Sequence, residues 1–375
     1  MDAGVWLKQL SGDDSYDTFI PNLLPLELPV PIDNKILTLL STADRFLGRL
    51  DGVCELLPDV DFFIFMYIRK EAASSSQIEG TVATLSDFFK AESEIDDPAR
   101  PADVQEIINY VSAMNYGIER LKELPLSLRL IKEIHFELMK DVRGQNKLPG
   151  EFRRSQNWIG AAQIENAVYI PPPPERLMTL LDDFEKFLHN DVPIPALIKI
   201  ALIHSQFELI HPFLDGNGRV GRLLTTFYLC EKGILRKPFL YLSEYFKKNR
   251  SLYYERLEAI SKRSDLLGWI VFFLEAIKEV SEEAVELSRK IIYLRERDRA
   301  KIAALGRSAK NAGLILERLY RYPFINSEIV RKTTNLSLPN ALQLIHRLEV
   351  LGILKKDSQK VRNMSFCYKD YIDLF

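Results

Sequence analysis

Two strongly apolar helical segments joined by a short polar loop constrain the fold of this chain more than any other feature. Pro195 begins the first segment, which runs through 196–210, and the second runs from about Gly218 to Cys230. Proline is favoured at the start of a helix, and helices that are apolar all round are buried. The sequence therefore predicts a mainly α fold in which this loop joins two buried helices.

Helical periodicity also covers most of the remaining chain. Apolar residues recur at intervals of three and four over 36–50 and 104–121, and further helices are predicted for 175–188 and 250–299. Residues 1–30, which include a proline-rich run, are expected to be irregular.

Two departures from the helical pattern indicate small β structures. Strand-like runs at 158–160 and 167–170 flank a polar turn, and four prolines follow, so we expect a β-hairpin there. The C-terminal part predicts three helices and a two-stranded hairpin, the order of a winged helix-turn-helix. Its helices are expected at 314–320, 327–334 and 339–351, and its strands at 351–354 and 366–368.

Composition excludes several classes of protein. The 50 basic and 52 acidic residues leave a net charge of −2, so the chain as a whole has no net positive charge that would attract nucleic acid or acidic lipid. Cys54, Cys230 and Cys367 have neither disulfide nor metal-site spacing, which favours a reducing cytoplasm. We expect no signal peptide and no contact with a membrane, because no apolar run is long enough to span one.

The loop itself has the features of a polyphosphate site. Gly216 and Gly218 permit a close approach of ligand to backbone, just before a helix N-terminus that favours anions. Arg219 and Arg222 lie three residues apart on that helix. Arginine is the preferred residue for binding phosphate, because its planar guanidinium can donate two hydrogen bonds to phosphate oxygens.

The same loop offers a base and a metal ligand. His211 can accept a proton at neutral pH, and Asp215 supplies a carboxylate oxygen of the kind that Mg²⁺ takes in nucleotide sites. The loop contains no serine or cysteine nucleophile, so the attacking hydroxyl is expected to come from a partner. This combination indicates nucleotidyl or phosphoryl transfer.

The segment 211–222 resembles the Fic family motif H-P-F-x-[DE]-G-N-G-R-x-x-R at every fixed position. The likeness extends to Gly150–Arg153, to the pair Tyr253–Tyr254, to a helical N-terminal extension and to a C-terminal winged helix. It implies a Fic helical fold with a β-hairpin flap. It also implies an N-terminal helical region over 1–100, a catalytic domain over 101–300 and a winged helix domain over 308–375.

The resemblance implies transfer of AMP from ATP to a Tyr, Ser or Thr hydroxyl of a protein, the chain itself included. His211 would take the proton, and Asp215 would hold Mg²⁺ or Mn²⁺. The residues that would bind ATP are Gly216, Asn217, Gly218 and Arg219 at the phosphates, Arg222 at the γ-phosphate and Tyr254 at the adenine. The residues of the flap, which would align the target by strand pairing, are Asn157, Trp158, Ile159, Val168 and Tyr169.

A second segment resembles the Fic inhibitory motif [ST]-x-x-x-E-[GN]. In a helix, Ser75 and Glu79 share one face, so that Ser75 can orient the Glu79 carboxylate, and Gly80 allows close packing. By resemblance, Glu79 pairs with Arg222 and fills the space of the γ-phosphate. From the residues alone, a solvated helix turn is the favoured interpretation.

Several alternatives stay open. A transcription regulator would bind DNA through the winged helix and only sense ATP, but retention of His211 and Asp215 favours the enzyme. Removal of AMP, or transfer of another nucleotidyl or phosphoryl group, would keep the fold. Arg347 is the one arginine of the predicted recognition helix, so protein docking or a homodimer contact is favoured over DNA binding. His204 is interpreted as a core histidine rather than a second base.

Overall fold

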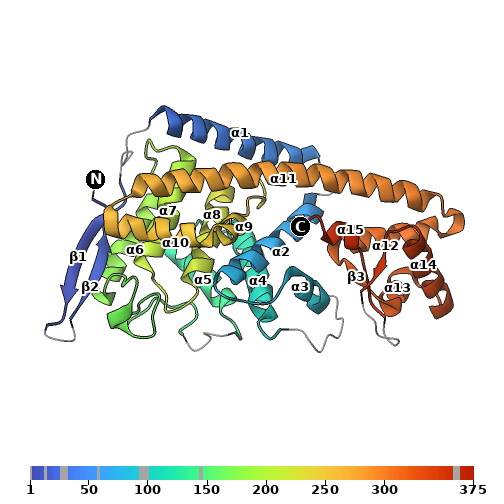
Figure 1. Ribbon diagram of the computed structural model, residues 1–375, viewed down its shortest axis with the longest axis horizontal. Helices are drawn as coiled ribbons and strands as arrows, with labels where there is room; N and C mark the ends of the chain where they lie inside the picture. The colour runs from blue at the N-terminus through green and yellow to red at the C-terminus, as the bar shows by residue number, and fades with distance from the viewer. Residues whose placement is uncertain are drawn as a thin grey trace.

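The protein is mainly helical, with two small antiparallel sheets, as the computed structural model shows (Figure 1). The structure describes residues 2–11, 15–25, 33–56, 60–92, 101–142, 147–357 and 364–375. The helices that precede the C-terminal part are α1 (Asn34–Leu56), α2 (Val60–Ile78), α3 (Leu85–Glu92), α4 (Val104–Arg120), α5 (Leu128–Leu138), α6 (Pro174–His189), α7 (Ala196–Ile210), α8 (Asn217–Glu231), α9 (Ser243–Lys248), α10 (Arg250–Arg263) and α11 (Leu266–Ala303).

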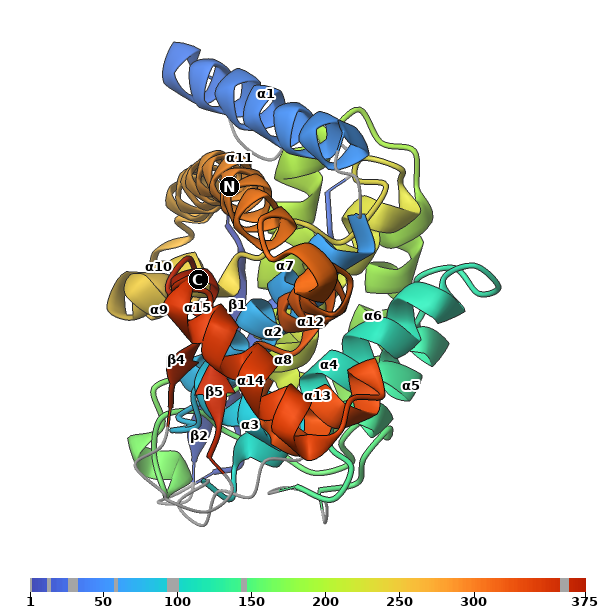
Figure 2. The ribbon, with the colours of Figure 1, turned by 90° about the vertical axis from the view of Figure 1, so that its right-hand side faces the viewer.

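The predicted pair of buried helices, α7 and α8, is confirmed at the centre of the molecule. Nearly every residue of both helices is buried, and the two pack against each other. The 38-residue helix α11 runs along the length of the molecule, and α1 packs along it on the outside (Figures 1 and 2). The loop between α7 and α8 is therefore supported at both ends by buried helices.

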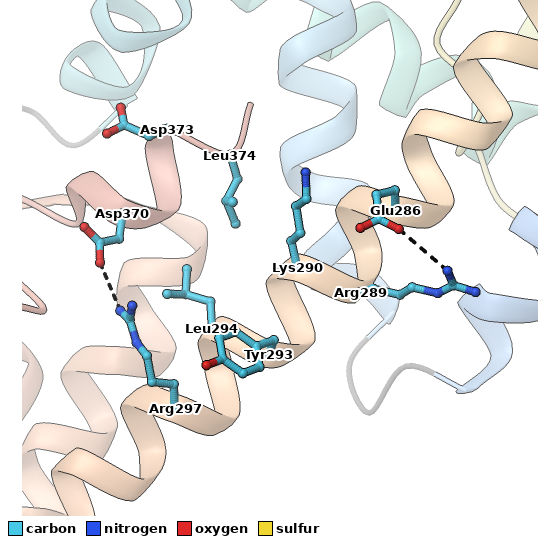
Figure 3. Close-up of a pocket in the computed structure, with 9 residues that line it drawn as sticks. All are labelled: Glu286, Arg289, Lys290, Tyr293, Leu294, Arg297, Asp370, Asp373 and Leu374. Carbon is cyan, nitrogen blue, oxygen red and sulfur yellow. Dashed lines mark hydrogen bonds and ion pairs between the residues drawn. The ribbon is translucent and has the colours of Figure 1, made fainter.

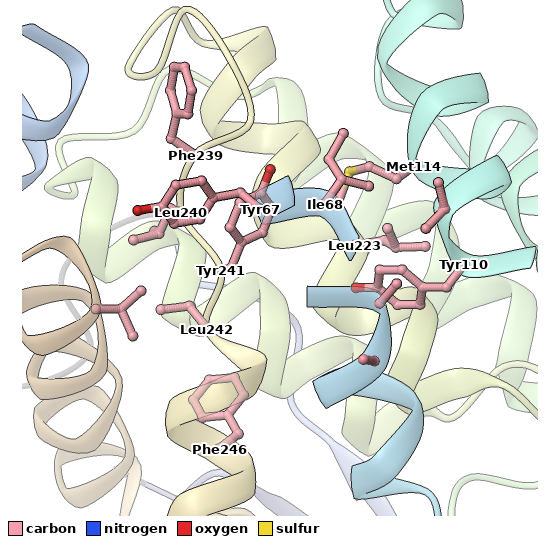
Figure 4. Packing of buried hydrophobic residues seen from close by; sticks show 14 of the residues in the cluster. Tyr67, Ile68, Tyr110, Met114, Leu223, Phe239, Leu240, Tyr241, Leu242 and Phe246 are labelled. Carbon is pink, nitrogen blue, oxygen red and sulfur yellow. The ribbon is translucent and has the colours of Figure 1, made fainter. Parts of the chain in front are cut away.

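A buried polar contact fixes α2 within the core. Glu71 of α2 accepts hydrogen bonds from the Tyr110 hydroxyl of α4, at 3.2 Å, and from the Ser243 amide at the start of α9, at 3.1 Å. Apolar side chains around this contact, among them Met114 and Leu223, fill the space between α2, α4 and α8 (Figure 4). The C-terminal end of α2 is therefore set firmly against the start of α8.

The expectation that residues 1–30 are irregular is wrong for 4–9 and 16–21, while residues 12–14 and 26–30 lie outside the described part of the chain. Strands β1 (Gly4–Gln9) and β2 (Tyr16–Pro21) form an antiparallel hairpin. Trp6 Nε1 donates to the Ser261 carbonyl at 3.2 Å, and Phe19 N donates to the Ile170 carbonyl at 3.0 Å. Contacts with residues far along the chain thus stabilise a hairpin that the local pattern does not reveal.

The C-terminal part contains α12 (Ala309–Arg321), β3 (Phe324–Ile325), α13 (Ser327–Thr334), α14 (Leu338–Val350), β4 (Lys355–Lys356), β5 (Phe366–Cys367) and α15 (Lys369–Ile372). Its three strands pair in the order β3-β5-β4. The strand expected at 351–354 is displaced, because a turn with Gly352 at φ +72° follows α14 and pairing begins only at Lys355. The winged helix and the three domain boundaries stay predictions.

The surface of α14 gives little support to the recognition of DNA bases. Its one arginine, Arg347, donates to the hydroxyl of Ser308, while Leu338 and Leu342 are exposed.

Within the described part of the chain, no helix combines the length and apolar character needed to cross a membrane. Cys230 and Cys367 are free thiols; the side chain of Cys54 lies outside the described residues.

Candidate active site

The loop between α7 and α8 forms the floor of a cavity of about 560 Å³. The predicted site residues that line this cavity are Glu79, Trp158, Ile159, Val168, Tyr169, His211, Asp215, Gly216, Asn217, Gly218, Arg219, Arg222 and Tyr254. Ser75, Gly80 and Asn157 lie outside its lining and act on it through neighbours. Segments that are far apart in the sequence therefore converge on one space.

His211 is held as a neutral imidazole. It ends α7 in the left-handed conformation, at φ 49°, and its Nδ1 lies 3.3 Å from the Glu208 carbonyl. Because a carbonyl only accepts, Nδ1 carries the proton in this contact and Nε2 is left as an acceptor. Burial, reinforced by the charge of Arg153, lowers the pKa of His211 to about 4. The ring is therefore an unprotonated base at neutral pH.

Two side chains to which the sequence analysis gave no role fix the backbone of the loop. The buried Arg153 guanidinium donates from Nε to the His211 carbonyl at 2.9 Å. His135 stacks on Phe213, with ring centroids 3.7 Å apart, and its Nε2 lies 3.0 Å from the Asp215 carbonyl. Burial lowers the pKa of His135 to about 4, so it is a neutral donor to that carbonyl.

Two amide side chains complete the support of the loop. Asn217 accepts from Phe213 N and donates to Phe213 O, both at 2.8 Å. Asn157, from the predicted flap, donates to the same carbonyl at 3.0 Å. Each polar atom of the Asn217 side chain thus makes one contact with the backbone, and its contact with phosphate stays a prediction.

A carboxylate lies beside the N-terminus of α8, the predicted anion site. Gly216, at φ +79°, precedes the helix, and no side chain caps it. The Glu79 carboxylate lies so close to the first turn that a Cβ added at Gly218 would collide with it. The free N–H groups and the helix dipole favour a negative charge at this place.

Arg222 connects Glu79 to the end of α2. Its NH2 donates to the Glu79 carboxylate at 2.7 Å, and its Nε donates to the Ser75 hydroxyl at 2.8 Å. The arginine side chain is 1% exposed and that of Glu79 31%. Burial acts against both charges, but the mutual attraction outweighs it, so the pKa of Glu79 is lowered and that of Arg222 is raised. Both groups are charged at neutral pH.

Two details of the Ser75–Gly80 segment differ from expectation. Ser75 does not orient Glu79 directly; its hydroxyl and its carbonyl both accept from Arg222, which in turn holds the carboxylate. Gly80 packs against nothing, because a Cβ there would meet no atom within 4 Å, and its positive φ of +97° is what requires glycine.

Arg219 and Asp215 stand at the other side of the anion site. Arg219 is buried, and its Nε and NH1 have no hydrogen-bond partner among the described residues. Asp215 is 40% exposed, and its Oδ1 accepts from Gly216 N at 2.6 Å. Among the described residues no cluster of three His, Cys, Asp or Glu forms a cage for a metal. One exposed carboxylate still fits Mg²⁺, which is commonly bound by one or two carboxylates together with substrate phosphates.

The predicted flap is a minimal hairpin with a single antiparallel pair, Ile159 with Tyr169. A 3₁₀ turn (Ile164–Asn166) connects its two sides. Val168 is half exposed, as a surface for strand pairing requires, and the Tyr169 hydroxyl donates to the Leu209 carbonyl at 2.7 Å. Tyr254 also lines the cavity and is 40% exposed, so its ring is accessible from it.

Glu208 is a cavity residue that the sequence analysis missed. Its Oε1 is buried without a hydrogen-bond partner among the described residues. Burial raises its pKa to about 8; Arg222 acts in the opposite direction, and Glu79 raises it further. A glutamate in a helix is ordinarily expected to be solvated, and the signal that could have found Glu208 was its position in a strongly apolar helix.

A second cavity, of about 600 Å³, lies between α11 and the C-terminal end of the chain (Figure 3). Four of its charged residues form ion pairs: Arg297 pairs with Asp370 at 3.0 Å and Arg289 with Glu286 at 3.6 Å. None of the described residues that line it is a histidine, so the cavity at the α7–α8 loop, which contains His211, is the candidate active site.

The comparisons with known proteins agree with this geometry. Residues 37–119 match the family model described as Fic/DOC family N-terminal, and residues 125–229 match that described as Fic/DOC family. The chain belongs to the Fic/DOC family. The second match contains the His211 loop, and the first contains Glu79, so both halves of the ion pair lie in Fic sequence.

Named relatives are similar over part of the chain. A probable protein adenylyltransferase of Aquifex aeolicus is 32% identical over 206 residues, which are 53% of this chain and 58% of the relative. The protein adenylyltransferase Fic of Drosophila erecta is 31% identical over 186 residues, 48% of this chain and 33% of the relative. The chain thus spans between a third and somewhat over half of the length of these curated relatives.

Solved structures share the Fic fold. A Fic family protein from Desulfovibrio desulfuricans G20 aligns with a TM-score of 0.59 at 21% identity, covering 91% of this chain and 98% of the other. A Fic domain containing signaling protein from Bacteroides thetaiotaomicron aligns with a TM-score of 0.54 at 17% identity, covering 66% and 97%. The mainly helical Fic fold predicted from the sequence is confirmed.

Glu208 predicts a pH-dependent stability. Its carboxyl ionises near pH 4.5 in the unfolded chain but only near pH 8 in the folded protein. Folding therefore takes up a proton between these values, and the stability of the parent falls as the pH rises through them. Glu208→Gln removes this loss, so its melting temperature should exceed that of the parent by more at pH 8 than at pH 5. The exposed control Glu255→Gln should show no such trend, and a pH-independent difference for Glu208→Gln would contradict the assignment.

Proposed function

We propose that this protein transfers AMP from ATP to a Tyr, Ser or Thr hydroxyl of a protein. The observation that carries this proposal is a single cavity in which the neutral His211 stands beside a helix N-terminus flanked by the buried Arg219 and Arg222. Such a site binds a polyphosphate next to a base. The relatives named protein adenylyltransferase support AMP as the group transferred.

The proposed reaction is one displacement at phosphorus. His211 Nε2 accepts the proton of the target hydroxyl while the hydroxyl oxygen forms a bond to the α-phosphorus of ATP. The bond from that phosphorus to the oxygen that bridges to the β-phosphate breaks, and pyrophosphate leaves with the bonding electrons. The start of α8 and Arg219 bind the negative charge of the phosphates, and the flap aligns the target by pairing with its backbone.

Asp215 is the proposed ligand of Mg²⁺ or Mn²⁺. Its carboxylate is exposed at the edge of the anion site, next to Arg219 at 3.7 Å. A divalent ion there would neutralise the charge of the phosphates and help to orient them. The protein's own part is to hold the carboxylate in place, through the hydrogen bond from Gly216 N and the support that His135 gives to the Asp215 carbonyl.

We propose further that Glu79 inhibits this activity. A carboxylate paired with Arg222 over the first turn of α8 competes with the γ-phosphate for the same charges. ATP then binds in a pose that is unsuited to transfer. The same carboxylate lies near His211, whose pKa it influences, and can orient a water, so removal of AMP is the second candidate reaction.

We propose three further assignments for the chain. The division into regions at 1–100, 101–300 and 308–375 follows the order of the helices. For the C-terminal part we favour docking of protein, either a target or a second copy, because α14 exposes Leu338 and Leu342 while its arginine is engaged. Modification of the chain by itself follows if one of its own hydroxyls reaches the cavity.

The base is tested by His211→Ala. With labelled ATP and Mg²⁺, label transfer should fall by about 10²–10⁴, because a general base contributes about that factor. ATP binding should remain, since the histidine backbone is held by Arg153. The surface variant His189→Ala should label at the parent rate. Parent-rate labelling by His211→Ala would rule out the mechanism.

The proposed inhibition by Glu79 is tested by Glu79→Gly. Label transfer should rise by at least several-fold, because the competing charge-assisted contact contributes about 1.5–3 kcal/mol. Arg222→Ala should not reproduce this rise, since it removes a ligand of the phosphate together with the partner of Glu79. The double variant should be as inactive as Arg222→Ala.

An unchanged rate in Glu79→Gly, with ATP binding confirmed, would leave Glu79 as a structural partner of Arg222 only. The transferase proposal would then depend on the His211 loop alone.

A further inference from the structure

His204 is a fully buried histidine that links two walls of the cavity without lining it. It lies on α7, which packs against both α8 and α10. Its Nδ1 is 3.0 Å from the Gly221 carbonyl of α8, and its Nε2 is 2.9 Å from the Tyr253 hydroxyl of α10. One imidazole thus joins three helices.

The chemistry of the partners determines the tautomer. The Gly221 carbonyl only accepts, so Nδ1 carries a proton and donates it. Burial lowers the pKa of His204 to about 3, so the ring is neutral and Nε2 accepts from the Tyr253 hydroxyl. Both ring nitrogens are therefore engaged, and His204 has no free acceptor with which to serve as a base, as the sequence analysis expected.

Aromatic packing makes this link rigid. The His204 ring stacks on Trp269 with centroids 5.7 Å apart and planes 11° apart. The Tyr253 ring stacks on Phe246 with centroids 4.6 Å apart. A buried ring clamped on its face and bonded at both nitrogens permits little sliding of α10 past α8.

The two partners of His204 each precede a residue of the proposed ATP site. Gly221 is followed by Arg222, at the phosphate end of the cavity, and Tyr253 is followed by Tyr254, at the proposed adenine end. We propose that His204 is a positioning residue that sets the spacing between these two ends, and so lets one ATP molecule contact both. This inference rests on the proposed nucleotide site.

The consequence is specific to ligands that span the cavity. A ligand that reaches both ends gains affinity because binding at one end places it for the other, and this gain depends on the spacing. Inorganic tripolyphosphate reaches only the phosphate end. Loosening of the link should therefore lower the affinity for ATP and leave the affinity for tripolyphosphate unchanged. General damage to the fold would lower both affinities.

The experiment compares three variants of the full chain by calorimetric titration with ATP and with tripolyphosphate. His204→Phe keeps an aromatic ring but removes both hydrogen bonds, and Tyr253→Phe removes only the hydroxyl. Tyr67→Phe is the control: it also removes only a buried hydroxyl, whose hydrogen bond to the Ala284 carbonyl at 3.1 Å joins α2 to α11 and includes neither His204 nor Tyr253.

We expect the dissociation constant of ATP to rise about 3- to 10-fold in His204→Phe and Tyr253→Phe, the factor for about one lost hydrogen bond. That of tripolyphosphate should stay within about twofold of the parent. The KM for ATP should rise in parallel while kcat changes little. Because the two variants break one link, the double variant should be no worse than His204→Phe. Tyr67→Phe should lower the melting temperature and leave both dissociation constants unchanged.

Equal weakening of ATP and tripolyphosphate, or unchanged binding of both, would overturn the positioning role. If His204→Phe does not fold, Tyr253→Phe decides the question alone. The transfer assay separates this inference from the proposed function: a parent that binds ATP through this link but transfers no AMP would overturn the function only. A parent that does not bind ATP would overturn both.

Discussion

The ion pair between Arg222 and Glu79 is the contact on which the rest of the site depends. A guanidinium that is almost fully buried is costly unless an anion accompanies it, and removal of one partner of such a pair leaves an uncompensated charge. Ser75 provides two further acceptors but no charge. If Glu79 inhibits as proposed, the same carboxylate that blocks the site also stabilises the protein without nucleotide. A triphosphate that displaced Glu79 would restore the charge balance with its own oxygens, and inhibition and affinity for ATP would have one physical origin.

The loop that carries His211 is rigid because other parts of the chain impose its shape. A left-handed residue other than glycine costs about 1–3 kcal/mol and persists only where its surroundings enforce it. Arg153, His135 and Asn157 bind three carbonyls of the loop, and Asn217 closes it from within. We therefore expect the proposed base and the proposed anion site to keep a fixed relation when a ligand binds, which is what a site that works by positioning requires.

Local sequence determines some of these features and leaves others open. Pro195 and the polar loop marked the ends of α7 and α8 well, because caps and helix breakers act within a few residues. The predicted partner of Ser75 was wrong. Residues four apart on a helix face each other, which favours Glu79, but the Ser75 hydroxyl is bound by Arg222, 147 residues away in the sequence. The N-terminal hairpin and the buried state of Glu208 likewise depend on tertiary contacts, which no short pattern encodes.

The central claim is that the Glu79 carboxylate occupies the place of the γ-phosphate. It is tested most directly by the affinity of the parent and of Glu79→Gln for ATP and for AMP, because the amide keeps the shape of the side chain and removes its charge. The account predicts that Glu79→Gln binds ATP at least several-fold more tightly than the parent and binds AMP, which has no γ-phosphate, equally well. Equal affinity of both proteins for ATP, or an equal gain for ATP and AMP, would contradict it.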